Sequence, residues 1–208
     1  MRLSDQDVKF AMTAGLIEID PMPAIECFGS FSVDLTLGNT FKIIRQKDPM
    51  YYDLMDLNRH AIHDHSAFNA QDGMETTIVE DHGRFCLPPG AFALGITKER
   101  VKIPNDMVGW LDGRSSLARL GLMIHITAFA IDPGWNGKIT LEFFNAGPLT
   151  LALAPGLRIG AISFEGLSSP SSLPYGSKPG AKYHGQDSPV ASRIEQDFCK
   201  MAKTTSPA

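Results

Sequence analysis

The chain has 208 residues, of which 43% are hydrophobic and 20% are charged. That composition excludes a disordered polymer, and the length predicts a single domain with its own hydrophobic core. The formal net charge of -4 disfavours a strongly basic nucleic-acid-binding protein. No apolar run reaches the roughly 18 residues that a membrane helix needs. The polar, acidic start MRLSDQDVKF does not look like a secretory signal, so a cytoplasmic protein is expected.

The first predicted element is a short helix that begins after Ser4. Ser4 is suited to the N-cap, and acidic residues follow in the first turn. Apolar residues share one face until Gly15 breaks the pattern: Val8, Met12 and Leu16.

Alternation of apolar and polar residues from Phe31 to Leu37 predicts a half-buried strand that ends at Gly38-Asn39. A partner strand is expected over residues 40–45. Further strands are predicted over residues 76–79, 91–97, 122–127, 138–144, 149–154 and 158–164. Many short strands separated by Pro- and Gly-containing turns predict a mainly β fold, a jelly-roll or β-barrel with a few short helices.

Residues 46–75 are less regular and contain three histidines in the stretch HAIHDH, His60, His63 and His65. Closely spaced imidazoles can share a metal ion. A solvated loop is the favoured interpretation, because no nearby cysteine or well-spaced carboxylate completes a ligand set.

Residues 167–190 are rich in Ser, Pro and Gly, which predicts a loop or mobile tail rather than a second core. Tyr175, Lys182, Tyr183 and Gln186 lie in this segment and could close over a ligand; a disordered terminus is the alternative. One domain is therefore expected over residues 1–190, with a closing tail from about 167 and a flexible C-terminus over 191–208.

The three cysteines, Cys27, Cys86 and Cys199, stand far apart, and no C-x-x-C motif is present. This pattern argues against a disulfide framework and against a cysteine-based zinc site. Isolated reduced thiols are expected.

The stretch GRSSLARLGL, residues 113–122, is the first candidate for chemistry. Arg114, Ser115 and Ser116 precede a short helical run that contains Leu117, Ala118 and Arg119. Serine hydroxyls, free backbone N–H groups and arginines can together bind an anion such as phosphate. A plain N-capped turn with solvated arginines is equally consistent with the spacing. The sequence is not a Walker loop.

The second candidate is Glu142, in the predicted strand over residues 138–144. Strand alternation places Ile139, Leu141 and Phe143 on one face, and Thr140 and Glu142 on the other. Glu142 either lies on the solvated face of a sheet or sits in a closed pocket, where a carboxylate can transfer protons.

Two further residues have open interpretations. His125, between Ile124 and Ile126, fits a hydrogen-bonded histidine of the core or an interface. Asp132 begins the tight turn DPGW. It either braces that turn or contacts a ligand hydroxyl.

Together, GRSSLARLGL, TAFAIDPGW and ITLEFFN closely resemble the dCTP deaminases of the dUTPase-like superfamily. The resemblance extends over most of the chain through MRLSDQDV, SVDLTLGNTFK, LPPGAFALGIT, DMVGWLDGRSS, PGLRIGAISFE and PYGSKPGAKYHGQ. Residues 46–75 match least. The ordered set is more specific than any single motif.

The resemblance implies a distorted jelly-roll subunit in a homotrimer, with active sites between subunits. It implies hydrolysis of dCTP to dUTP and ammonia, which supplies dUTP for dUMP and dTTP synthesis. Mg²⁺ would accompany the triphosphate, dTTP would be a feedback inhibitor, and neither nucleic acid nor membrane is an expected partner.

The resemblance also implies residue roles. Glu142 would be the general acid/base, supported at the reacting centre by Ser115 and Arg119. The substrate would be bound by residues from several segments: Arg114, Ser115, Ser116, Leu117, Ala118, Arg119, Asp132, Thr140, Leu141, Glu142, Tyr175, Lys182 and Gln186.

Zinc-dependent cytidine deaminases use an H-x-E and a P-C-x-x-C motif to make a metal-bound hydroxide. Neither motif is present. A zinc-free reaction is therefore expected, in which the Glu142 side chain activates the attacking water.

The sequence departs from the resemblance at two places. Phe129-Ala130 stands where the monofunctional members have His-Arg, and Ala161 stands where the bifunctional branch tends to have Gln. The second departure favours dUTP over dUMP as the product. The alternatives are a dUTPase or bifunctional deaminase on the same fold, a non-catalytic nucleotide-binding regulatory trimer, and a structural β-trimer without a ligand.

Overall fold

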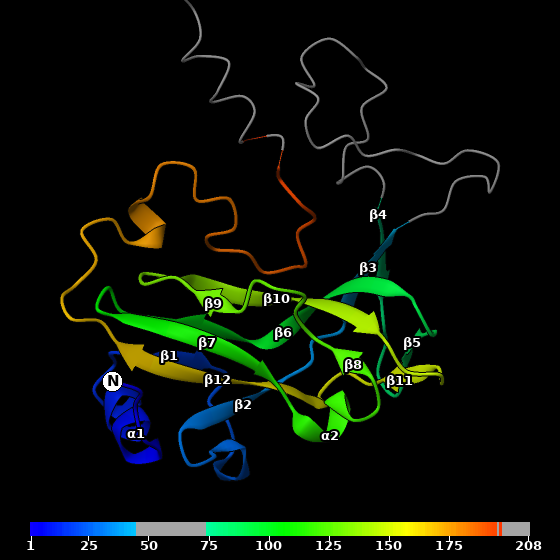
Figure 1. The fold of residues 1–208 in the computed structure, drawn as a ribbon, viewed down its shortest axis with the longest axis horizontal. Coiled ribbons are helices and arrows are strands. Elements are labelled where there is room, and N and C mark those ends of the chain that lie inside the picture. Colours follow the sequence, from blue (N-terminus) through cyan, green and yellow to red (C-terminus); the bar gives the residue numbers. More distant parts are fainter. Residues whose placement is uncertain (45–73, 195, 197–208) are drawn as a thin grey trace, which may run out of the picture.

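The computed structural model describes residues 1–44, 74–194 and 196, and the chain is mainly β (Figure 1). The elements in chain order are α1 (Asp5–Thr13), β1 (Glu18–Asp20), η1 (Ile25–Cys27), β2 (Ser32–Thr36), β3 (Thr40–Ile44), β4 (Met74–Ile78), β5 (Phe85–Leu87), β6 (Phe92–Lys102), β7 (Met107–Gly113), α2 (Ser115–Ala118), β8 (Leu122–Met123), β9 (Ala130–Ile131), β10 (Asn136–Asn145), β11 (Leu151–Leu153), β12 (Arg158–Gly166) and η2 (Tyr175–Ser177).

The described strands form antiparallel sheets that pack against one another. The larger sheet has the order β4-β3-β6-β10-β8, and β1 pairs with β6 beside this path. The second sheet has the order β2-β12-β7-β9, and β5 and β11 form a small two-stranded sheet. The predicted mainly β fold with a few short helices is confirmed. The strands in the described part of the chain do not close into a barrel.

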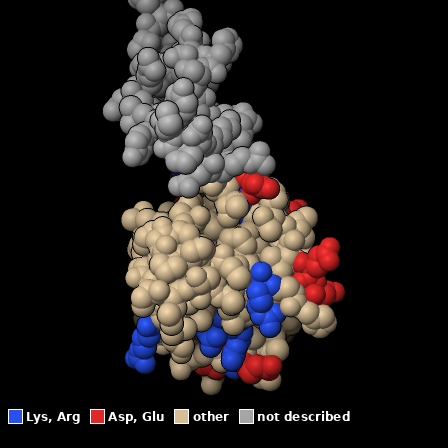
Figure 2. Space-filling model, turned by 90° about the vertical axis from the view of Figure 1, so that its right-hand side faces the viewer, with Lys and Arg blue, Asp and Glu red and all other residues tan. Residues whose placement is uncertain are grey.

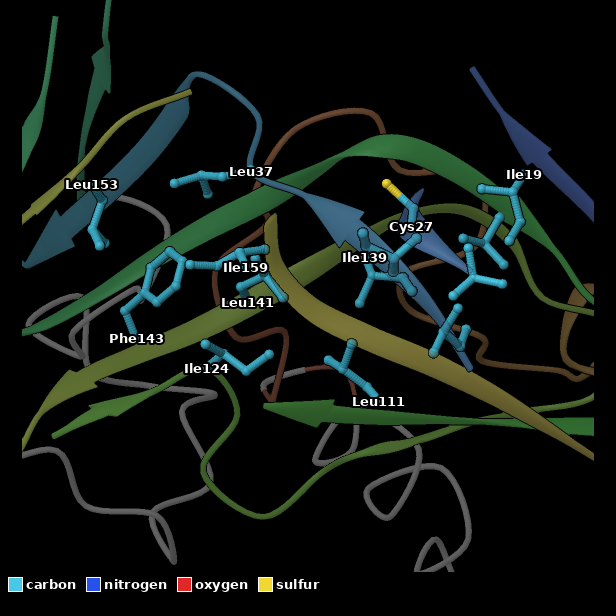
Figure 3. Packing of buried hydrophobic residues seen from close by; sticks show 14 of the residues in the cluster. Ile19, Cys27, Leu37, Leu111, Ile124, Ile139, Leu141, Phe143, Leu153 and Ile159 are labelled. Carbon is cyan, nitrogen blue, oxygen red and sulfur yellow. The ribbon is translucent and has the colours of Figure 1, made fainter. Parts of the chain in front are cut away.

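One hydrophobic cluster joins the two larger sheets. Its fully buried members include Phe41 and Phe143 from the first sheet and Leu35 and Phe164 from the second. Burying a side chain of this size contributes about 2–3 kcal/mol of favourable transfer free energy. Figure 3 shows Ile139, Leu141 and Phe143 within this cluster. The predicted alternation of β10 is therefore confirmed.

The N-terminal helix begins as predicted. The Ser4 hydroxyl accepts the backbone N–H of Asp7, and the Asp7 carboxylate accepts the N–H of Ser4, which completes a capping box. The helix ends at Thr13, so Leu16 lies beyond it and is 48% exposed. The prediction that Leu16 shares a helix face with Val8 and Met12 is therefore wrong.

Four short or irregular strands were not predicted from the sequence: β1, β5, β7 and β9. β7 contains Gly109, Asp112 and Gly113, which are weak strand formers, and it forms because β12 pairs with it along its length. Conversely, β8 ends at Met123 rather than at 127. Beyond it, the Ile126 N–H is bonded to the Glu142 carboxylate instead of to a neighbouring strand.

Residues 167–194 pack against the body of the protein rather than forming a disordered terminus. Ala191 is fully buried, so packing continues just past the predicted boundary at 190. The domain limits stay a prediction. The three histidines of HAIHDH and Cys199 lie outside the described residues. None of the described helices is long and apolar enough to span a membrane.

The two described cysteines differ in environment, which gives a testable prediction. Cys27 is buried in the core and Cys86 is exposed (Figure 3 shows Cys27). Burial raises the pKa of the Cys27 thiol, and the negative charge of Asp34 raises it further. Because the thiolate is the reactive form, we expect iodoacetamide at pH 8 to alkylate Cys86 at least about 100-fold faster than Cys27.

Peptide-resolved mass spectrometry measures both rates on the same sample. Labelling in guanidinium chloride is the control, because unfolding removes the difference in burial. Equal labelling rates in the native protein would contradict the prediction.

Candidate active site

A cavity of about 480 Å³ lies between the large sheet and the tail. Figure 1 shows the tail, in orange, on the side of β9 and β10. The cavity is lined by residues of the sheet, of the segment before β10 and of the tail: Ile44, Met74, Phe92, Leu94, Ala128, Ala130, Ile131, Asp132, Trp135, Ile139, Thr140, Glu142, Tyr175, Tyr183, Gln186, Val190 and Ser192.

Glu142 projects from the middle of β10 and is partly buried. Its Oε2 accepts the backbone N–H of Ile126 at 2.9 Å, and its own N–H donates to the Ile124 carbonyl. Among the described residues, Oε1 has no hydrogen-bond partner. The carboxylate is thus held through one oxygen, and the other remains available for proton transfer in the cavity.

Two polar atoms of cavity-lining residues are buried without a partner among the described residues. They are Thr140 Oγ1 and Gln186 Oε1. The other end of the Gln186 amide is fixed, because its Nε2 donates to the Lys138 carbonyl at 2.9 Å. A buried polar group without a partner costs about 1–3 kcal/mol, so a ligand with matching polar groups would offset that cost. Gln186 Oε1 can only accept, whereas the Thr140 hydroxyl can donate or accept.

The turn over residues 132–135 forms one wall of the cavity and a contact for the tail. Gly134 has a φ of +78°, and a Cβ at this position would lie 2.6 Å from the Cβ of Pro174. Glycine is therefore needed both for the turn and for the close approach of the tail. The Asp132 carboxylate lines the cavity, 3.9 Å from Lys178 Nζ, instead of bracing the turn.

Hydrogen bonds hold the tail over the sheet. The Gly185 N–H donates to Asn136 O, and the Lys138 N–H donates to Gln186 O, so the tail extends the free edge of β10. The Tyr175 hydroxyl accepts the N–H of Tyr183, and the two rings belong to the cavity wall. The predicted closing segment therefore contributes side chains to the same cavity as Glu142.

The stretch around α2 lies apart from this cavity. None of the candidate residues from Arg114 to Arg119 lines it, and Ser115, Ser116 and Arg119 are exposed. Figure 1 shows α2 at the edge of the molecule away from the tail. Within one protomer, the predicted acid/base and the predicted anion-binding residues are thus not brought together.

Other predicted residues occupy different environments. Leu141 is fully buried in the core, so only its backbone could contact a ligand. Lys182 does not line the cavity, and its carbonyl accepts from the Arg193 guanidinium. His125 Nδ1 is buried without a partner among the described residues, and the expected place of this histidine in the core or an interface stays a prediction.

The two residues that depart from the resemblance have separate places. Phe129 packs against Trp110 and His125, with ring centroids 5.6 and 5.7 Å away. Ala130 lines the cavity. Sequence reasoning did not predict the apolar part of the wall, which includes Trp135, Phe92 and Leu94. Leu94 lies in the wall because it pairs with Glu142 in the sheet. This pairing depends on the strand register, which the sequence alone does not show.

The described residues hold no group of three or more His, Cys, Asp or Glu side chains placed to bind a metal ion. On the face shown in Figure 2, most of the surface carries no charge, with basic groups gathered low in the view and acidic groups mainly at one edge. Although the net charge is only -4, the basic and acidic side chains on this face are unevenly distributed (Figure 2).

Comparison with known proteins identifies the family of this chain. The family described as dCTP deaminase-like matches residues 2–167. The chain belongs to this family. It is 50% identical to a dCTP deaminase of Rhodospirillum rubrum over 95% of this chain and 98% of that protein. It is 49% identical to a dCTP deaminase of Actinobacillus succinogenes over 95% of this chain and 100% of that protein.

A solved structure also matches the fold. It is the crystal structure of a 2'-deoxycytidine 5'-triphosphate deaminase from Agrobacterium tumefaciens, with a TM-score of 0.57 and 17% identity. The match covers 78% of this chain and 47% of that chain. At this identity the likeness establishes the fold alone.

Proposed function

We propose that this protein is an enzyme that hydrolyses dCTP to dUTP and ammonia. The observation that carries the proposal is the identity of about half of all residues with dCTP deaminases over 95% of the chain. A cavity with a hydrogen-bonded carboxylate and two polar atoms that lack a partner within the described part of the chain supports it.

In the proposed reaction, Glu142 is the catalytic general acid/base. Its carboxylate takes a proton from water as the water oxygen bonds to C4 of the cytosine. Glu142 passes this proton to N3. It then takes the remaining water proton from the C4 hydroxyl and gives it to the amino group, as the C4–N bond breaks and ammonia leaves. The C4 carbonyl of uracil remains, so atoms and protons balance without a metal-bound hydroxide.

Thr140 Oγ1 and Gln186 Oε1 would form hydrogen bonds with the nucleoside and so orient it. Asp132 would lie near the deoxyribose, and Tyr175 and Lys182 would belong to the segment that closes over it. Ser115 and Arg119 would stabilise charge at the reacting centre, while Arg114 and Ser116 would contact the phosphates.

The separation of α2 from the cavity within one protomer favours a site built from two protomers. We therefore propose a homotrimer with active sites between subunits, in which Leu117 and Ala118 belong to the wall contributed by the neighbour. Mg²⁺ would arrive with the triphosphate as part of the substrate. The enzyme would act in the cytoplasm, with dTTP as a feedback inhibitor.

The test is to incubate the protein with dCTP and Mg²⁺ and to measure ammonia, dUTP, dUMP and pyrophosphate together. We expect equal amounts of ammonia and dUTP, without pyrophosphate. Release of pyrophosphate and dUMP would instead identify a bifunctional deaminase. Nucleotide binding without turnover would identify a regulatory protein and overturn the proposal.

A further inference from the structure

Arg114 is held by the protein itself. Its Nη1 donates to the Arg158 carbonyl at 3.1 Å, and its Nη2 lies 3.4 Å from Asp34 Oδ2. Two of its terminal nitrogens thus have partners at fixed places in the second sheet. A guanidinium has five N–H donors in a rigid plane, so fixing two nitrogens orients the remaining donors.

The strand register brings these groups together. β12 lies between β2 and β7, and Ala161 pairs with Asp34 on one side and with Asp112 on the other (Figure 1). Residues directly opposite in adjacent strands share a face of the sheet. Because Ala161 has only a methyl group, the Asp34 carboxylate can reach past it toward Arg114, which directly follows β7.

Asp34 also contacts a second cation. Its Oδ2 lies 3.4 Å from Arg158 Nη1, which donates to the Glu26 carbonyl as well. The Asp34 side chain is 19% exposed, less than those of Arg114 at 29% and Arg158 at 41%. Asp34 is thus shared by two guanidinium groups and is the least exposed member of the cluster.

We propose that Asp34 is a positioning residue for the triphosphate of the substrate, acting through Arg114. The inference rests on the proposed function, in which Arg114 contacts the phosphates. Asp34 holds the guanidinium in one orientation before the nucleotide binds. The side-chain entropy of Arg114 is then lost on folding rather than on binding, which strengthens its contact with phosphate.

Asp34→Asn tests the proposal, because asparagine keeps the shape and removes the charge. We expect the KM for dCTP to rise about tenfold with kcat within about twofold of wild type, since a charge-assisted contact is weakened and the reacting centre is not. Inorganic tripolyphosphate, used as a competitive inhibitor, should lose affinity by a similar factor. An unchanged or lowered KM would overturn the inference.

The Arg114 variants separate this inference from the proposed function. If Arg114→Gln raises KM and Asp34→Asn does not, positioning by Asp34 is wrong and the phosphate role of Arg114 stands. If Arg114→Gln leaves KM unchanged, the phosphate role itself fails. In the double variant, Asp34→Asn should add no further rise to that of Arg114→Gln, because Asp34 acts through that side chain.

Asp5→Asn is the matched control, because Asp5 forms an exposed ion pair with Lys9 on α1, away from this cluster. It should leave KM unchanged. If Asp34→Asn does not fold, Asp34→Glu keeps the charge but displaces the carboxylate by one methylene. A rise in KM of about threefold with kcat unchanged is then expected, and a wild-type KM would contradict the proposal.

Discussion

Replacing Glu142 with glutamine should lower kcat for dCTP deamination by about a thousandfold, because general acid–base catalysis typically contributes 10²–10⁴-fold. An amide cannot take a proton from water or return it to the leaving amine. We expect the dissociation constant for dCTP to stay within about threefold of wild type, because the substitution removes proton transfer, which stabilises the transition state and not the bound substrate.

The structure explains why this substitution should spare the fold. Glutamine has nearly the shape of glutamate, and its amide oxygen can still accept the Ile126 N–H that Glu142 Oε2 accepts at 2.9 Å. The segment between β8 and β9 thus keeps its anchor on β10. Glu142 is also on the cavity side of the strand, so the substitution does not change the packing of the hydrophobic core on the other side.

Ammonia release gives kcat, and calorimetric titration with dCTP gives binding. Glu18→Gln is a matched control. Glu18, on β1, forms an exposed ion pair with Lys102 at 2.6 Å, and Glu18 does not line the cavity. The control should turn over at the wild-type rate. Near-normal turnover by Glu142→Gln would contradict its assignment as the general acid/base.

Elements whose signal is local were predictable from the sequence. The capping box at Ser4 and Asp7 depends on residues three apart, and the alternation in β10 depends on neighbours in the chain. β7 lacks such a signal, because its glycines are weak strand formers and its pairing with β12 is a long-range contact. The end of β8 was also not predictable, because the Ile126 N–H beyond it is bonded to the distant Glu142 side chain.

The candidate site divides in the same way. Period-two alternation placed Glu142 on the polar face of its strand, and the cavity wall includes it. The apolar wall around Leu94 depends on strand register, which no local pattern encodes. The tail was ambiguous because its composition fits both a disordered terminus and a closing segment, whereas its hydrogen bonds to Asn136 and Lys138 settle that it packs on the sheet.

An Arg119→Ala variant and a Glu142→Gln variant should each lack activity and should regain it when their chains are mixed in one oligomer. Arg119 lies outside the cavity that Glu142 lines in the same protomer. Suppose that a neighbouring subunit supplies Arg119 to that cavity. An Arg119→Ala chain then still provides an intact Glu142, and a Glu142→Gln chain still provides an intact Arg119. Sites between the two kinds of chain can then be complete.

The amount of recovered activity tests this arrangement. In a random equal mixture, about one quarter of interfaces combine an intact Glu142 from one chain with an intact Arg119 from the next, so about one quarter of wild-type activity is expected. Mixing Glu142→Gln with the double variant Arg119→Ala/Glu142→Gln should restore none, because every Glu142 is then lost. Failure of the first mixture, with exchange of differently tagged chains verified, would mean that each protomer completes its own site. The separation of α2 from the cavity would then have to close by movement within one chain.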